Sequence, residues 1–121
     1  MARKTFPGLS YSRFTQALAP AGLPSTAVFP VYGLAEASLA ATFTEAMSPL
    51  RSTSFRRDRM SQGERAEVLD PEDPAALSLV CLGRPMCNLE LCLADAEGQP
   101  VEPGCVGEIH IRGPSVTRGY H

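Results

Sequence analysis

The first residues follow a helical pattern. Within residues 11–22, apolar side chains recur at the spacing of one helical face, at Tyr11, Phe14, Ala17 and Leu18. Pro20 and Gly22 come next and predict the end of that helix, because neither residue continues a helix well.

A strand pattern follows the helix. Residues 26–32, TAVFPVY, are β-branched and aromatic and predict a short buried strand. Pro30 lacks an N–H group and therefore favours a sheet edge or a strand end. The small residues from Gly33 to Thr44 fit either a short helix or an extended loop, and their periodicity does not decide between them.

The middle of the chain is charged. Residues 48–76 place basic side chains first and acidic ones later, which predicts a long, partly mobile surface segment. Its cluster Arg56–Arg59 could attract phosphate or could form an ordinary solvated face.

From residue 77 the pattern is that of β-structure. LSLVCLG predicts a strand that is closed by a turn at Gly83-Arg84-Pro85. Residues 88–94 alternate, with Leu91 and Leu93 on one face, and residues 106–112 alternate in the same way. The two segments are predicted to pair antiparallel.

Composition narrows the class of protein. The chain has 121 residues, room for about one domain, and 44% of them are hydrophobic. A net charge of −2 gives no basic excess for nucleic acid. No apolar run suits a membrane span or a signal peptide, so a cytoplasmic protein is expected. The four cysteines, at 81, 87, 92 and 105, show no zinc spacing and are expected to be buried free thiols.

Glu36 is a lone carboxylate among small and apolar residues, just after Tyr32-Gly33. It could hold a divalent cation against a phosphate, since magnesium is often bound by one or two carboxylates together with substrate phosphates. It could instead sit at a helix N-terminus, where the dipole stabilises negative charge. Tyr32 could stack on a flat ring or simply pack.

Two stretches resemble a known family. FPVYGLAEASLAATF resembles the Tyr-Gly-x-Thr/Ala-Glu motif of the acyl-adenylate-forming (AMP-binding) enzymes, and is most similar to that of the fatty acyl-AMP ligases. The later stretch VGEIHIRGPSVTRGY resembles a second motif of that family. The resemblance extends from Arg13 to Tyr120.

The resemblance implies a site at Tyr32, Gly33, Ala35 and Glu36. Tyr32 would lie beside the adenine of ATP, and Gly33 would let the backbone approach the acyl and nucleotide groups. Glu36 would be the catalytic residue that binds Mg²⁺. Ala35 stands where many relatives have a threonine that touches phosphate, so that contact would be missing. The substrates would be ATP and a fatty or other carboxylic acid.

The resemblance also implies an acceptor and a fold. The acceptor would be an acyl carrier protein or coenzyme A, and the segment Arg56–Asp73 falls where such ligases can carry an insertion linked to that choice. The fold class would be α/β, an internal fragment of an adenylate-forming N-terminal domain. Residues 11–45 would end an α/β sheet, residues 46–76 would form a charged surface insert, and residues 77–121 would form an antiparallel, barrel-like part.

Other family motifs are not found in the chain. It has no phosphate loop, no Thr-Gly-Asp ribose motif and no C-terminal domain with its catalytic lysine. Little or no adenylation by the chain alone is therefore expected. Two other readings remain open: a noncatalytic protein-interaction module, and a decayed remnant of such an enzyme. Apolar faces normally covered by the rest of the domain would be exposed.

Overall fold

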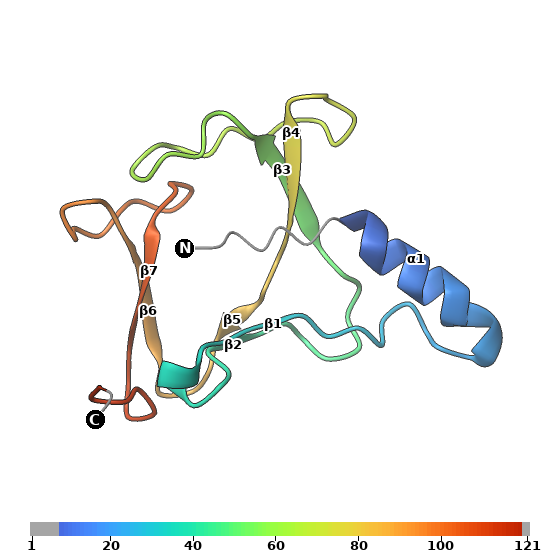
Figure 1. Ribbon diagram of the computed structural model, residues 1–121, viewed down its shortest axis with the longest axis horizontal. Coiled ribbons are helices and arrows are strands. Elements are labelled where there is room, and N and C mark those ends of the chain that lie inside the picture. The colour runs from blue at the N-terminus through green and yellow to red at the C-terminus, as the bar shows by residue number, and fades with distance from the viewer. Residues whose placement is uncertain (1–7, 120–121) are drawn as a thin grey trace.

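The computed structural model describes residues 8–119, and it begins with a single α-helix (Figure 1). This helix, α1 (Gly8–Leu18), runs into the 3-10 turn η1 (Ala19–Ala21). Gly22 ends the turn with a left-handed φ of 87°, and its N–H donates to the Ala19 carbonyl. The predicted helix and its stop are confirmed, although the helix starts earlier than residue 11.

The predicted apolar face of α1 is not buried within the described residues. Phe14 is 54% exposed and Leu18 is 38% exposed, whereas Thr15 is buried. The Thr15 hydroxyl donates to the carbonyls of Tyr11 and Ser12 at 3.2 and 3.1 Å. Helical spacing therefore identified the element correctly, but no part of residues 8–119 covers the side of α1 with Phe14 and Leu18.

A small three-stranded sheet carries the loop that contains Glu36. Its antiparallel order is β1 (Val31–Tyr32), β2 (Thr42–Phe43) and β5 (Arg84–Pro85). The predicted strand over 26–32 is wrong before Val31, because a turn closes there with the Ala27 N–H donating to the Pro24 carbonyl. Pro30 does sit at a strand end, and β1 does lie at a sheet edge.

Two further predictions for the middle of the chain need correction. Arg84–Pro85 forms β5 and pairs with β2, so the turn predicted at 83–85 does not form there. The charged segment 48–76 contains the strand β3 (Ser52–Arg56), which pairs antiparallel with β4 (Ala76–Val80). The strand β3 reads Ser-Thr-Ser-Phe-Arg, without an alternating apolar pattern that would reveal it. Ser54 is buried, with its hydroxyl 2.7 Å from that of Ser78.

The predicted hairpin near the C-terminus is confirmed. The strands β6 (Glu90–Ala94) and β7 (Glu108–Arg112) pair antiparallel, with Leu91 opposite Ile111 and Leu93 opposite Ile109. These four apolar residues share one face, as the alternation predicted. Ala94, at the end of β6, is buried to 1% exposure.

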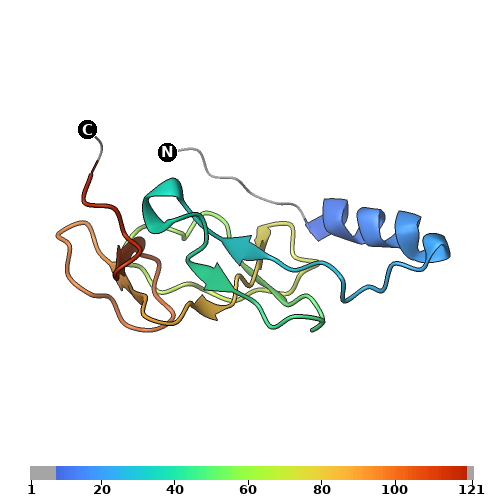
Figure 2. The same cartoon turned by 90° about the horizontal axis from the view of Figure 1, so that it is seen from below.

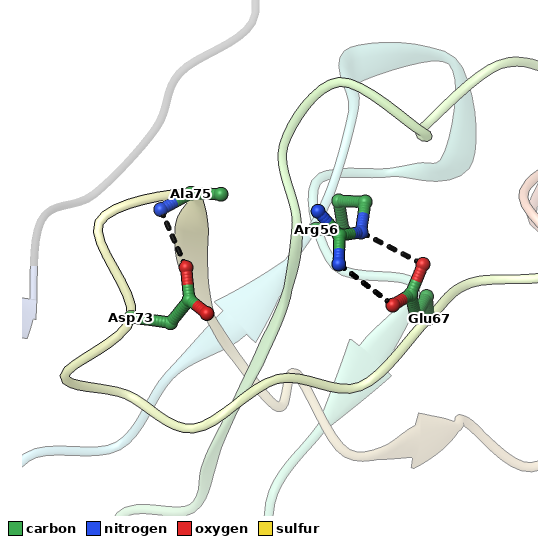
Figure 3. A network of polar contacts seen from close by, with 4 residues as sticks. All are labelled: Arg56, Glu67, Asp73 and Ala75. Carbon is green, nitrogen blue, oxygen red and sulfur yellow. Dashed lines mark hydrogen bonds and ion pairs between the residues drawn. The ribbon is translucent and has the colours of Figure 1, made fainter.

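The loop 61–69 connects the two hairpins, β3–β4 and β6–β7. Its Gly63 and Ala66 N–H groups donate to the Val106 and Gly104 carbonyls at 2.7 and 2.8 Å. Its Leu69 N–H donates to Ser54 at 2.9 Å. Figure 3 shows the side-chain part of this link, a two-pronged contact in which Arg56 Nε and Nη2 donate to the Glu67 carboxylate at 2.8 and 2.9 Å. Part of the predicted surface insert is thus a structural bridge.

The three sheets lie around an open, flattened arrangement, and α1 projects at one end (Figures 1 and 2). None of the described sheets closes into a barrel. The core is small, since the buried hydrophobic residues are alanines: Ala37, Ala41 and Ala94. The cysteines are free as predicted, but Cys81, Cys87 and Cys92 are exposed and Cys105 is only half-buried, so the expectation of burial is wrong for all four. Within residues 8–119, no helix is long and apolar enough to cross a membrane.

Candidate functional site

Glu36 lies at the tip of a tight hairpin. The strands β1 and β2 pair through Val31–Phe43 and Tyr32–Thr42, and the loop 33–41 joins them. The Ala41 N–H donates to the Tyr32 carbonyl at 2.8 Å and closes the base of the loop. Tyr32 is therefore the last strand residue before the loop, and it lies at the base of the loop that carries Glu36.

Gly33 is required by the packing of this loop. A β-carbon built on Gly33 would lie 1.6 Å from the Leu39 carbonyl oxygen and 3.0 Å from the Ala40 α-carbon. Those atoms are backbone and cannot rotate away, as the end of a side chain could. The two limbs of the loop approach so closely that only glycine fits.

Glu36 itself sits in the 3-10 turn η2 (Ala35–Ala37) and is half-buried. The open choice between a short helix and an extended loop is thus settled as one helical turn followed by β2. Ala37 beneath it is 2% exposed and anchors the turn. Ser38 and Leu39 follow with positive φ angles of 59° and 90°. Such angles are uncommon for residues other than glycine and cost about 1–3 kcal/mol each.

The loop 113–119, which follows β7, hydrogen-bonds to this tip. The Thr117 N–H donates to the Glu36 carbonyl at 2.7 Å. The Ser38 hydroxyl donates to the Ser115 carbonyl at 3.0 Å, across 77 positions of sequence. In Figures 1 and 2 the loop 113–119 lies beside η2. The structure therefore brings together the two stretches that carried the family resemblance.

The four predicted site residues lie together, Tyr32 at the end of β1 and Gly33, Ala35 and Glu36 in the loop 33–41. Tyr32 and Glu36 are half-buried, and Gly33 and Ala35 are exposed. The sequence pattern did not identify Ser38 or Thr117, because their hydrogen bonds, to Ser115 and Glu36, depend on where the loop after β7 lies. A shallow pocket elsewhere is lined by residues such as Pro30, Thr44 and Cys81, and none of the four predicted residues lines it.

The donor set around Glu36 can be tested against magnesium. Within residues 8–119, no group of three or more His, Cys, Asp or Glu side chains converges on a point that could hold a metal ion. A self-contained metal site is therefore not formed by these residues. A single half-buried carboxylate does fit Mg²⁺ that is held mainly by nucleotide phosphates, because that ion needs only one or two protein carboxylates.

The basic cluster Arg56–Arg59 is partly occupied by other contacts. Arg56 is held by Glu67, which raises the pKa of Arg56 through their hydrogen bond and charge attraction. The same hydrogen bond to Arg56 lowers the pKa of Glu67 below its usual value. Arg57 Nη2 donates to the Ala76 carbonyl at 3.3 Å. These contacts favour the solvated structural face over a phosphate site.

The fold and the Glu36 loop are those of the adenylate-forming class of enzymes. Residues 9–121 match the AMP-binding enzyme family, and the chain belongs to that family. The predicted family and fold class are confirmed by this match and by the likeness to solved ligase structures.

The chain is similar to fatty-acid AMP ligases and to an adenylyltransferase. The chain is 35% identical over 109 residues to the long-chain-fatty-acid–AMP ligase FadD32 of Mycolicibacterium smegmatis, covering 89% of the chain and 17% of that protein. It is 36% identical, with the same coverage of both chains, to a 4-hydroxyphenylalkanoate adenylyltransferase of Mycobacterium marinum.

Solved structures show the same arrangement. The fatty acid AMP ligase of Legionella pneumophila superposes with a TM-score of 0.85 at 28% identity, over 97% of this chain and 20% of that one. An adenylation domain of a keto acid-selecting NRPS module has a TM-score of 0.83 at 21% identity, covers 98% of this chain and 23% of that one, and shares the fold. The chain thus spans about a fifth of the length of the proteins it matches.

Proposed function

We propose that this chain supplies the glutamate loop of an ATP-dependent ligase that activates a fatty or other carboxylic acid as its acyl-adenylate. The single observation that supports this most is the position of Glu36, in a constrained loop of a chain that belongs to the AMP-binding enzymes. One of the matched structures, the L. pneumophila fatty acyl-adenylate ligase, is described as a complex with acyl adenylate and pyrophosphate.

In the proposed reaction the carboxylate of the acid attacks the α-phosphate of ATP, a new acyl–phosphate bond forms, and pyrophosphate leaves. Magnesium, when bound, would neutralise charge on the phosphates. Glu36 would hold that ion, and Tyr32, at the base of the loop, would lie against the adenine ring. Gly33 holds the loop in shape, and Ala35 offers no hydroxyl to a phosphate. Such catalysis works by positioning and charge stabilisation.

The chain by itself is proposed to turn over little or no acid. Its described residues provide one carboxylate at the site and no converging set of metal ligands. The test is pyrophosphate exchange by the purified chain with a panel of fatty acids. No exchange is expected, and clear turnover would contradict the proposal.

A hybrid enzyme tests the positive half of the proposal. Residues 9–121 would replace the matching segment of the L. pneumophila fatty acid AMP ligase, which aligns over 97% of this chain. We expect the hybrid to form acyl-adenylate, and we expect Glu36→Gln to lower that rate at least about 100-fold, as loss of an electrostatic contact at a reacting group does. A folded hybrid whose activity is unchanged by Glu36→Gln would rule out the role of Glu36.

A second candidate function is a noncatalytic interaction module. The observation in its favour is the number of large apolar side chains that the chain leaves exposed, among them Phe14, Val31, Leu39, Met47 and Val68. Where exposed apolar side chains form a contiguous patch, they mark contact sites for other protein parts. The two candidates separate in the hybrid, because an interaction module predicts that Glu36→Gln has no effect on adenylate formation.

A further inference from the structure

We infer that Ser38 is a positioning residue, which fastens the loop 113–119 to the hairpin tip and thereby fixes the direction of Glu36. This inference deepens the proposed function and takes its catalytic meaning from it. The hydrogen bonds that support it are present in the structure whether or not the ligase activity is confirmed.

The first observation is backbone geometry directly after Glu36. Ser38 has φ 59° and ψ 38°, and Leu39 has φ 90° while remaining 78% exposed. No burial of the Leu39 side chain offsets its strained backbone. Two consecutive residues in disfavoured conformations persist only where surrounding contacts hold them.

The second observation concerns those contacts. Some are local, since the Ser38 and Leu39 N–H groups donate to the Ala35 and Leu34 carbonyls at 3.1 Å, and the others come from one distant segment. The Ser38 hydroxyl donates to the Ser115 carbonyl at 3.0 Å, and the Thr117 N–H donates to the Glu36 carbonyl at 2.7 Å. The two bonds run in opposite directions between the same two loops. They therefore act as a clamp: one bond is made at Glu36 itself, and the second is made at Ser38, two residues later.

The third observation is that the loop 113–119 is itself held in place. A β-carbon on Gly113 would lie 2.5 Å from the Asn88 carbonyl oxygen, so this loop leaves β7 in close contact with the start of the β6 hairpin. The Val116 N–H donates to the Gly113 carbonyl at 3.1 Å and shapes the turn. The clamp thus connects the Glu36 loop to the β6–β7 hairpin, a firmly paired part of the molecule.

The test compares three variants of the full chain by amide hydrogen exchange. Ser38→Gly removes the hydroxyl and also relieves the strain, because glycine adopts a positive φ at no steric cost. Ser38→Ala removes the hydroxyl and keeps the strain. Ser38→Asn retains a side-chain donor and tolerates the left-handed region.

We expect the Thr117 amide to exchange about fivefold faster or more in Ser38→Gly and Ser38→Ala, because one net hydrogen bond is lost, and to recover in Ser38→Asn. The Val106 amide, which donates to Glu64 at 2.8 Å, is the internal control and should not change. Equal acceleration at Val106 would show that Ser38 supports the whole fold and would overturn the local role. Unchanged exchange at Thr117 would overturn the clamp.

A second measurement addresses Glu36 directly. Three-bond couplings of the Glu36 side chain should report one main rotamer in the parent chain and averaging among rotamers in Ser38→Gly. If Thr117 loosens while the Glu36 couplings stay the same, Ser38 fastens a loop without positioning the carboxylate, and the inference is wrong. Failure of the proposed function would appear elsewhere, as a hybrid ligase indifferent to Glu36→Gln.

Discussion

Gly33 is the residue on which the shape of the Glu36 loop depends most directly. We expect Gly33→Ala to lower the free energy of unfolding by about 3 kcal/mol, because its β-carbon would meet the Leu39 backbone carbonyl at 1.6 Å. Urea unfolding followed by circular dichroism measures this.

The matched control for Gly33 is Gly98→Ala. Gly98 has a φ of 78° and no atom within 4 Å of an added β-carbon. Alanine there adds only left-handed backbone strain, which should lower the free energy of unfolding by about 1 kcal/mol. An equal loss in both variants would mean that the loop 33–41 opens easily and does not hold Glu36.

At the scale of elements, the bridge between the hairpins is the feature that the sequence concealed. We expect the amides of Gly63, Ala66 and Leu69 to be protected from hydrogen exchange, because each donates to a carbonyl of another segment. Protection factors near one at all three positions would restore the sequence-based expectation of a mobile surface segment and contradict the bridge.

The ion pair of that bridge makes stability depend on pH. The contact with Arg56 lowers the pKa of Glu67, so the folded chain holds this carboxylate ionised more readily than the unfolded chain does. Its stabilising contribution is therefore complete above the ordinary glutamate pKa and is lost as pH falls through the lowered value. Both side chains are substantially exposed, so the effect is small.

Thermal unfolding from about pH 6 down to about pH 3 measures that contribution. The parent chain should lose more stability over this range than Glu67→Gln does, since the variant has no carboxylate at this position to protonate. Parallel curves for the two chains would show that the Arg56–Glu67 contact in Figure 3 does not stabilise the fold.

The strands show how far sequence could predict the elements. Leucine and isoleucine alternate in β6 and β7, so their pairing and their shared apolar face followed from period two. The strand β3 reads Ser-Thr-Ser-Phe-Arg and β5 is the dipeptide Arg84–Pro85, so neither has an alternating apolar pattern. Their pairing is decided by partners far away in sequence. The same is true of Ser38 and Thr117, whereas Glu36 stood out because its neighbours are small and apolar.

At the scale of the whole molecule, the chain exposes more surface than its size requires. Its accessible surface is 9355 Å². A compact monomer of 12.9 kDa exposes roughly 6,300 Å². The extra area includes large side chains such as Phe14 and Met47, at 54% and 63% exposure. In the matched ligases the corresponding segment is about a fifth of the chain.

This surface should be detectable in solution. We expect the isolated chain to bind an apolar fluorescent dye strongly, and the dye signal to fall when residues 9–121 are placed in the hybrid ligase, where other parts of the domain would cover the apolar face. Weak dye binding by a folded isolated chain would mean that its apolar side chains cover one another.

In the proposed enzyme, Glu36 holds the magnesium ion of a bound nucleotide. The most direct test is the magnesium dependence of acyl-adenylate formation by the hybrid ligase with Glu36, with Glu36→Gln, and with the control Glu97→Gln in an exposed turn. We expect Glu36→Gln alone to raise the magnesium concentration for half-maximal rate at least about tenfold. The same magnesium dependence in all three enzymes would contradict the account.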